Sequence, residues 1–246
     1  MSEKKRILVI NGSPKVNNSL TIKMTRGFVE GIEDAFDCET DYLNVSEMNI
    51  KPCTGCLSCW GRTEGECIIK GDDMPKAREM ILRSDIIIIS FPLYFFGLPG
   101  TLKVFIDRLL GIMLTFSGQQ LDENNEKKHR LRYPREGQRL AVISSSGFSE
   151  AEDVFDGVKK QFDLAIGENN YFAVCSPQLK AIAEAGSGQR FEKLYAKYKE
   201  AGRQFALNGK ADPELLKELA KPQLTPKTYK VIMEKYWSDQ KAGAVK

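Results

Sequence analysis

Residues 7–21 read ILVINGSPKVNNSLT, an apolar run that breaks directly into a loop of Gly, Ser, Asn and Lys and then into a helical pattern. A buried strand that leads into a helix in this way leaves the first backbone N–H groups of the helix unpaired beyond the end of the strand. These groups and the helix dipole both favour an anion. The stretch therefore predicts a phosphate site after the first strand. The alternative is an ordinary turn in which Ser19 is the N-cap of the helix.

The composition is that of a globular protein with a full hydrophobic core. The chain has 246 residues, of which 42% are hydrophobic and 28% charged, and its net charge is +3. This charge is too small to indicate nucleic-acid binding, and no apolar run approaches the roughly 18 residues of a membrane span. The start, MSEKKR followed by a strand, lacks the apolar region of a signal peptide. We therefore expect a cytoplasmic protein without nucleic-acid or membrane partners, whose cysteines are reduced or bind metal.

Strand-like and helical segments alternate along the chain. Strands are predicted at 6–10, 39–43, 86–89, 140–143 and 171–174. Helices are predicted near 19–35, 74–83, 101–110, 151–166 and 191–207. Nearly continuous apolar strands alternating with helices predict an α/β fold with a parallel sheet that is covered on both faces. Five strands fit the doubly wound, flavodoxin-like order 2-1-3-4-5, whose ligand binds where strands one and three diverge.

The predicted domain plan has one main domain and an appendage. Residues 1–209 form the main domain, which contains a cysteine-rich loop at 51–72 and a polar insertion at 111–138. Residues 210–246 are predicted as a helical C-terminal extension of one or two helices, because prolines interrupt the helical pattern there.

The fold predicts that the loops after strands one, three and four meet at one ligand. The first loop is rich in hydroxyl groups and has neither G-x-x-x-x-G-K-[ST] nor G-x-G-x-x-G, so it suits the phosphate of FMN better than a nucleoside triphosphate. The second loop carries Tyr94, our candidate for stacking on the flavin ring, followed by Phe95 and Phe96, for which core packing is the alternative. The third loop, Ser144–Gly147, is small enough to lie beside the ring.

Three motifs together resemble a known family. They are residues 7–21, the cysteine loop that ends in Asp72-Asp73-Met74, and SFPLYFFGLPGTLKVFIDR at 90–108. Over about residues 5–205 the chain resembles the NADPH-dependent FMN reductase superfamily, and it is most similar to the group containing the iron–sulfur flavoproteins. The resemblance implies a flavodoxin-like fold, bound FMN, and a homodimer or homotetramer.

The resemblance also assigns the FMN-binding residues, with the phosphate on the first loop and the ring on the second. With the third loop included, the predicted FMN-binding residues are Ser13, Lys15, Asn18, Ser19, Leu20, Thr21, Pro92, Leu93, Tyr94, Phe95, Phe96, Gly97, Ser145, Ser146 and Gly147. Asp107 and Arg108, in the helix after the second loop, are expected to make helix or subunit contacts rather than to take part in chemistry.

The cysteine loop has the chemistry of a metal site. Cys53, Cys56, Cys59 and Cys67 follow the spacing C-x2-C-x2-C-x7-C, and Gly55 allows the sharp turn that such a spacing needs. Zinc ribbons usually separate two C-x2-C pairs by about a dozen residues, so the shorter spacing favours a cubane cluster. It resembles the compact motif of the iron–sulfur flavoproteins. We expect a [4Fe-4S] cluster, with free thiols, zinc or a redox disulfide as alternatives.

Flavin chemistry requires few side chains, because the cofactor carries the reaction. The single histidine, His129, lies in the polar insertion without a triad around it, and no catalytic side chain is assigned. We expect an oxidoreductase of the NAD(P)H-dependent FMN reductase or quinone oxidoreductase type, which transfers electrons from NAD(P)H through FMN to a quinone, flavin or other acceptor. The alternative is an iron–sulfur flavoprotein that transfers electrons between ferredoxin and FMN without nicotinamide turnover.

Overall fold

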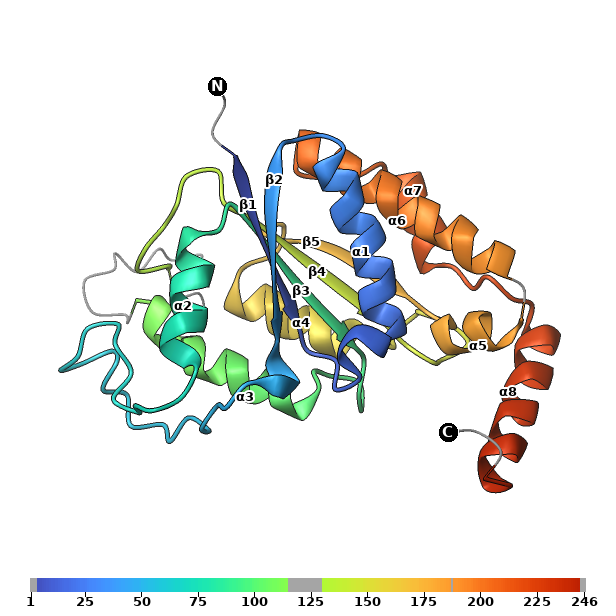
Figure 1. Cartoon of the computed structure of the whole chain (residues 1–246), viewed down its shortest axis with the longest axis horizontal. Helices are drawn as coiled ribbons and strands as arrows, with labels where there is room; N and C mark the ends of the chain where they lie inside the picture. Colours follow the sequence, from blue (N-terminus) through green and yellow to red (C-terminus); the bar gives the residue numbers. More distant parts are fainter. Residues whose placement is uncertain (1–3, 115–129, 187, 244–246) are drawn as a thin grey trace.

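The computed structural model describes residues 4–114, 130–186 and 188–243, and its centre is a parallel sheet (Figure 1). The strands are β1 (Lys5–Asn11), β2 (Cys38–Asn44), β3 (Ile86–Pro92), β4 (Arg139–Ser145) and β5 (Phe172–Ser176). All four neighbouring pairs are parallel, and the order is β2-β1-β3-β4-β5. The predicted flavodoxin-like sheet is therefore confirmed.

Helices cover both faces of this sheet (Figure 1). They are α1 (Leu20–Glu33), α2 (Met74–Arg83), α3 (Gly100–Asp107), α4 (Asp156–Ala165), α5 (Leu179–Glu184), α6 (Gly188–Asn208), α7 (Pro213–Ala220) and α8 (Pro226–Lys241). Short 3-10 helices are η1 (Val16–Asn18), η2 (Val45–Glu47) and η3 (Arg108–Ile112). One hydrophobic core lies beneath α1, α5 and α6, and the other beneath α2, α3 and α4.

Strand β1 shows why its sequence is a continuous apolar run rather than an alternating one. Ile7 and Val9 belong to the core under α1 and α6, whereas Leu8 and Ile10 belong to the core on the opposite face. Side chains of a strand point alternately to the two faces of a sheet. A strand covered on both faces must therefore be apolar at every position, which is what the sequence pattern predicts.

Helix α1 is held against α6 by direct contact between their backbones. A Cβ atom added at Gly31 would lie 1.9 Å from the carbonyl oxygen of Lys199, and one added at Gly202 would lie 1.9 Å from that of Phe28. Only glycine fits at either position. The contact fixes α1, whose N-terminus begins directly after the loop that follows β1.

The predicted segments agree with the structure except at two helices. Helix α4 begins at Asp156 rather than near residue 151, and the six-residue helix α5 was not predicted. The extension contains two helices, and both begin at a proline, as its sequence indicates. The polar insertion predicted at 111–138, including His129, lies in part outside the described residues.

The extension packs on the main body. Leu219, Leu224 and Met233 are buried in the same core as α1 and α6. The boundary predicted between residues 209 and 210 remains a prediction. Among the helices that the structure describes, none has both the length and the apolar character of a membrane span.

Candidate functional site

The carboxyl ends of the central strands surround a cavity of about 340 Å³, which we call the strand-end pocket. Its walls come from the loops after β1, β3 and β4, and from α5. The lining residues are Ser13, Lys15, Asn18, Ser19, Leu20, Thr21, Pro92, Leu93, Tyr94, Ser145, Ser146, Gly147, Leu179, Lys180, Ala183 and Glu184. The pocket thus brings together residues from all three loops that the sequence analysis singled out. Phe95, Phe96 and Gly97, which are also described, lie outside this lining.

The loop after β1 is held in shape by amide side chains. The backbone N–H of Ser13 donates to Oδ1 of the buried Asn11 at 3.0 Å, and Nδ2 of Asn11 donates to Oδ1 of Asn44 at 3.0 Å. The backbone N–H of Lys15 donates to the Ser13 hydroxyl at 3.3 Å. The loop is therefore ordered by strands β1 and β2 before any ligand binds.

Ser19, at the start of α1, is both the N-cap of the helix and a residue that lines the strand-end pocket. The Ser19 hydroxyl accepts a hydrogen bond from the backbone N–H of Ile22 at 3.5 Å, so the predicted N-cap is confirmed. Ser19 also lines the strand-end pocket. A capped helix start still directs the remaining N–H groups of its first turn and its dipole toward the pocket, which favours an anion there.

Buried hydroxyl groups tie α1 to the strand ends. The hydroxyls of Thr21 and Ser145 are hydrogen-bonded at 2.6 Å, and those of Thr25 and Ser90 at 2.7 Å. Thr25 also donates to the backbone oxygen of Thr21 at 3.0 Å. These bonds join α1 to β3 and β4, so the helix start and two strand ends form one rigid frame.

The loop after β4 presents an unpaired hydroxyl. Ser146 Oγ is buried and has no hydrogen-bond partner among the described residues. Its backbone is fixed, since its N–H donates to the oxygen of Ser176 at 3.0 Å and its oxygen accepts from the N–H of Leu179 at 3.2 Å. A buried hydroxyl without a partner costs about 1–3 kcal/mol. A polar ligand group in the pocket would remove this cost, which fits a cofactor with many hydrogen-bonding atoms.

The loop after β3 contains a tight turn. The N–H of Tyr94 donates to the oxygen of Gly97 at 3.1 Å, and the reverse bond is 2.9 Å. Phe95 and Phe96, which lie between these two residues, adopt left-handed φ values of 48° and 61°. Both side chains are exposed, so the alternative that they pack in the core is wrong. Phe96 stacks on Phe148 with ring centroids 5.2 Å apart. Bulky residues rarely adopt this conformation, and such strain is concentrated at functional sites.

Helix α5 adds a wall that the sequence analysis missed. It contributes Leu179, Lys180, Ala183 and Glu184 to the strand-end pocket. It follows β5, so the rule that ligands bind at the carboxyl ends of parallel strands could have indicated it. Its two charged residues lie close together, with 2.6 Å between Lys180 Nζ and Glu184 Oε1.

A second, much smaller cavity of about 40 Å³ is lined by Cys53, Cys59 and Cys67, and we call it the cysteine pocket. Cys56, also described, is exposed and lies outside this lining. Burial raises the pKa of the Cys59 thiol, whereas hydrogen bonds with Ser58 lower that of Cys56. Within residues 4–114, 130–186 and 188–243, no three His, Cys, Asp or Glu side chains are arranged to hold a metal ion. The metal site therefore stays a prediction.

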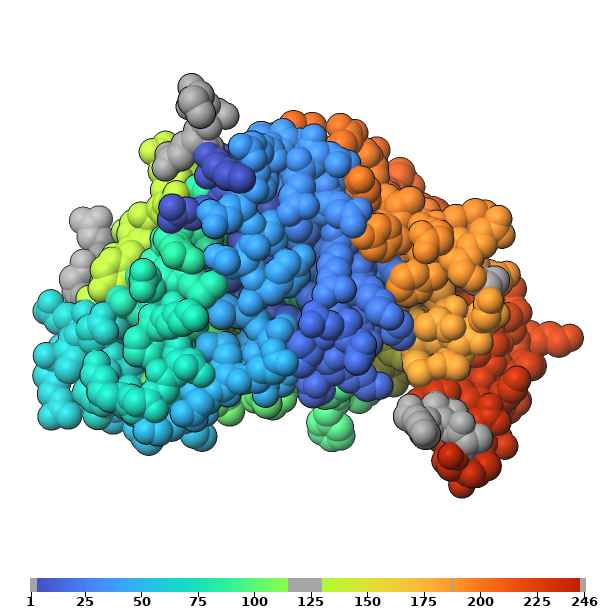
Figure 2. All heavy atoms as spheres, in the orientation of Figure 1, coloured from blue at the N-terminus to red at the C-terminus, as the bar shows by residue number. Residues whose placement is uncertain are grey.

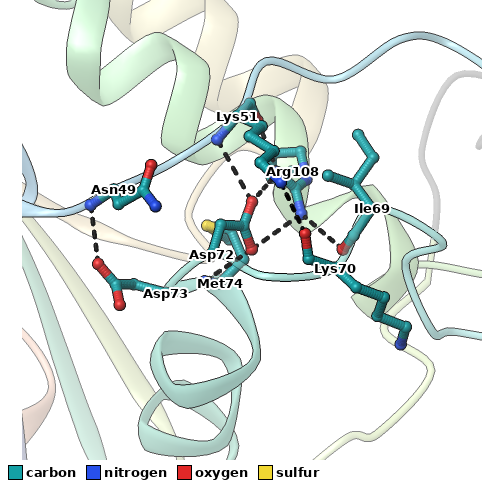
Figure 3. A network of polar contacts seen from close by, with 8 residues as sticks. All are labelled: Asn49, Lys51, Ile69, Lys70, Asp72, Asp73, Met74 and Arg108. Atoms are coloured by element: carbon teal, nitrogen blue, oxygen red, sulfur yellow. Dashed lines mark hydrogen bonds and ion pairs between the residues drawn. The ribbon is translucent and has the colours of Figure 1, made fainter.

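Arg108 forms hydrogen bonds with both ends of the cysteine loop (Figure 3). Its Nη1 donates to Oδ2 of Asp72 at 2.5 Å and to the backbone oxygen of Lys51 at 2.6 Å, and its Nη2 approaches the oxygen of Ile69 at 3.5 Å. The side chains of Arg108 and Asp72 are both 0% exposed. Lys51 precedes the first of the four cysteines and Ile69 follows the last. The expected helix or subunit contact of Arg108 is thus a contact with this loop.

The Arg108–Asp72 pair is also electrostatically coupled. Burial alone would raise the pKa of the Asp72 carboxyl, but hydrogen bonds from Arg108 and from the N–H groups of Lys51 and Met74 outweigh it and hold the pKa below its usual value. The neighbouring Asp73 accepts from the N–H of Asn49 at 2.7 Å, which fixes the turn before α2 (Figure 3). The buried ion pair between Arg108 and Asp72 thus closes the cysteine loop.

Comparison with known proteins finds one family. A family model described as "Flavodoxin-like fold" matches residues 5–175. An iron-sulfur flavoprotein of Clostridioides difficile is 37% identical over 103 residues, which are 42% of this chain and 44% of that protein. An FMN-dependent NADH:quinone oxidoreductase of Pseudomonas putida is 24% identical over 119 residues, 45% of this chain and 59% of that protein. The aligned parts span about half the length of these curated relatives.

Solved structures share the architecture. An FMN-dependent NADH-azoreductase from Bacillus anthracis, in complex with FMN, has a TM-score of 0.59 and 19% sequence identity. The alignment covers 82% of this chain and 100% of that one. At this identity the likeness is one of fold.

Proposed function

The chain belongs to the flavodoxin-like family, and from this premise we propose that it is an FMN-dependent oxidoreductase that passes electrons from NAD(P)H to a quinone, flavin or other acceptor. The observation that carries the proposal is the strand-end pocket. It gathers every residue predicted to bind FMN apart from Phe95, Phe96 and Gly97. The name of the relative in Pseudomonas putida supports the same activity, and the name of the relative in Clostridioides difficile supports a bound flavin.

In this proposal the protein binds and orients the cofactor. The ammonium of Lys15, the hydroxyls of Ser13 and Ser19 and the N-terminus of α1 hold the phosphate. Residues 92–97 and 145–147 flank the ring, with Tyr94 as the stacking side chain. The chemistry that FMN supplies when bound is acceptance of a hydride from the nicotinamide and onward transfer of its electrons.

The decisive experiment measures flavin binding and turnover together. Protein purified without oxygen should show flavin absorbance bands and should oxidise NADPH or NADH in the presence of a quinone. The Lys15→Ala variant should bind FMN more weakly, because it removes a cation from the pocket. Lys23→Ala, on the exposed face of α1, is the matched control and should bind like the wild type. Wild-type protein that binds no FMN would overturn the proposal.

We also propose that Cys53, Cys56, Cys59 and Cys67 hold a [4Fe-4S] cluster. Four thiols are the donor set that such clusters take, and three of them line one pocket. This favours the second candidate function, an electron-transfer protein between ferredoxin and FMN. Fast reduction by ferredoxin without reaction with either nicotinamide would select it. Iron, sulfide and zinc assays decide between the cluster, zinc and free thiols.

Two coarser properties complete the proposal. We expect a homodimer or homotetramer, which light scattering coupled to size-exclusion chromatography measures. We also expect the protein in the cytoplasm, which fractionation of the source cells tests.

A further inference from the structure

The C-terminal extension lies beyond residues 5–175, the part of the chain that the family model matches. In Figure 1, α8 lies beside α5, at the end of the sheet where the strand-end pocket opens. The space-filling view shows the red surface of α8 adjoining the orange surface of the preceding helices (Figure 2). The family match gives this extension no role, yet it packs on a wall of the pocket.

A buried glutamine joins the extension to the main body near the pocket. The Oε1 of Gln178 accepts hydrogen bonds from the N–H groups of Gln223 at 2.9 Å and Leu224 at 2.8 Å. Its Nε2 donates to the oxygens of Ser149 at 2.9 Å and Leu224 at 3.2 Å. Gln178 immediately precedes α5, and Ser149 follows the pocket loop after β4. One side chain therefore joins the extension to two walls of the pocket.

Two aromatic residues of α8 then contact residues that line the pocket. The hydroxyl of Tyr229 donates to the backbone oxygen of Gly147 at 2.7 Å. The ring of Tyr236 lies 4.3 Å from Nζ of Lys180, an approach at which the ring attracts the cation. Lys180 is held at the same time by Glu184. Gly147, Lys180 and Glu184 all line the strand-end pocket.

We propose that α8 helps to position the residues that bind the cofactor in the strand-end pocket. Tyr229 positions the loop at Gly147, and Tyr236 positions Lys180. The inference rests on the proposed FMN site. Gly147 lies in a segment without helix or strand, between Ser146 and Phe148, whose backbones are hydrogen-bonded to the strand β5 and to Gln178. The Tyr229 hydroxyl adds the bond that holds the oxygen of Gly147 itself. A loop that is already ordered binds its ligand more tightly, because less conformational entropy is lost on binding. Tyr229 and Tyr236 are thus positioning residues.

The test is a titration of the cofactor-free full-length protein with FMN, followed by flavin fluorescence. Tyr229→Phe keeps the ring and removes the hydroxyl that holds Gly147. The dissociation constant for FMN should rise about two- to tenfold, which is the effect of one neutral hydrogen bond. The absorbance spectrum of bound FMN should also shift, since the loop beside the ring changes. Tyr236→Leu should weaken binding in the same direction.

Tyr195→Phe is the matched control. It also removes a hydrogen-bonded hydroxyl, which donates to Glu30 at 2.5 Å on the side of α6, and Tyr195 is not among the lining residues. The control should bind FMN like the wild type. Equal weakening in Tyr229→Phe and Tyr195→Phe would assign the effect to general stability and overturn the inference. Unchanged binding in Tyr229→Phe would overturn it too. Wild-type protein that binds no FMN would instead remove the proposed function itself.

Discussion

The strand-end pocket and the cysteine pocket are built in opposite ways. The first is wide, about 340 Å³, and its walls are ends of strands and starts of helices joined by buried hydroxyl groups. The second, about 40 Å³, lies between α2, η3 and a loop whose residues 51–57 form no helix or strand, and Arg108 of η3 both lines it and holds that loop. The topology of the sheet creates the first pocket, whereas long-range side-chain contacts, among them the ion pairs Arg108–Asp72 and Arg78–Glu66, maintain the second. Damage to either pocket should therefore leave the other largely intact.

The largest expected effect on stability comes from breaking the ion pair between Arg108 and Asp72, which closes the cysteine loop. Arg108→Leu leaves the carboxylate of Asp72 buried without its partner, and the free energy of unfolding should fall by about 3–5 kcal/mol. Urea denaturation measures this. Arg108→Leu combined with Asp72→Leu should recover much of the loss, because both buried charges are gone. The exposed pair Lys103–Asp107 is the control, and Lys103→Ala should cost less than about 1 kcal/mol.

A smaller effect should come from the frame of the strand-end pocket. Thr21→Val leaves the buried Ser145 hydroxyl without its partner, which should lower the free energy of unfolding by about 1–3 kcal/mol. FMN binding should weaken, while the iron content of the protein stays that of the wild type. Thr21→Val combined with Ser145→Ala should be closer to wild-type stability, since both polar partners are removed. A parallel loss of iron in Thr21→Val would mean that the two pockets are coupled.

Part of the dependence of stability on acid pH should come from Asp72, in the cysteine region. The pKa of Asp72 lies below its usual value of 3.8 in the folded protein, so the unfolded chain takes up its proton first as the pH falls. The stabilising contribution of Asp72 is therefore complete above pH 3.8 and is lost as the pH falls through the folded pKa. Denaturation curves between about pH 5 and 2 for the wild type and for the Arg108→Leu/Asp72→Leu variant measure this contribution. Identical slopes in the two proteins would contradict it.

The smallest effect on stability should come from Cys56→Ser. Cys56 is exposed and lies outside the lining of the cysteine pocket, so the thermal midpoint of the cluster-free protein should not change measurably. Iron and sulfide should fall, because a cluster would lose one of its four ligands. Unchanged iron and sulfide in this variant would exclude Cys56 as a ligand.

The strand-end pocket was largely predictable because its information is local. Apolar runs locate the strands, parallel strands place their following loops at one edge, and Ser19 marks the helix start by its chemistry. Helix α5 was not predicted because it has only six residues. The residue before it, Gln178, adopts a left-handed backbone conformation that its residue type does not indicate.

Features that depend on distant residues were not predictable. Arg108 and Asp72 are separated by 36 positions, and nothing around either residue indicates the other. The turn at Phe95 and Phe96 is local, but its residue types were misleading. Adjacent aromatic residues are typical of a core, and only the hydrogen bonds between Tyr94 and Gly97 show that the chain reverses there and exposes them.

The close contact of α1 with α6, at Gly31 against Lys199 and at Gly202 against Phe28, extends the reach of the strand-end pocket far along the chain. An added methyl group at Gly202 would meet the oxygen of Phe28 and push α1 away from α6. Because the start of α1 is tied to β3 and β4, that displacement would be transmitted to the turn before α1, which lines the strand-end pocket. Substitutions at Gly202 should thus change the shape of the strand-end pocket, although Gly202 is not among its lining residues. In a library of random variants screened for yellow colour, colourless clones should cluster at both ends of α1.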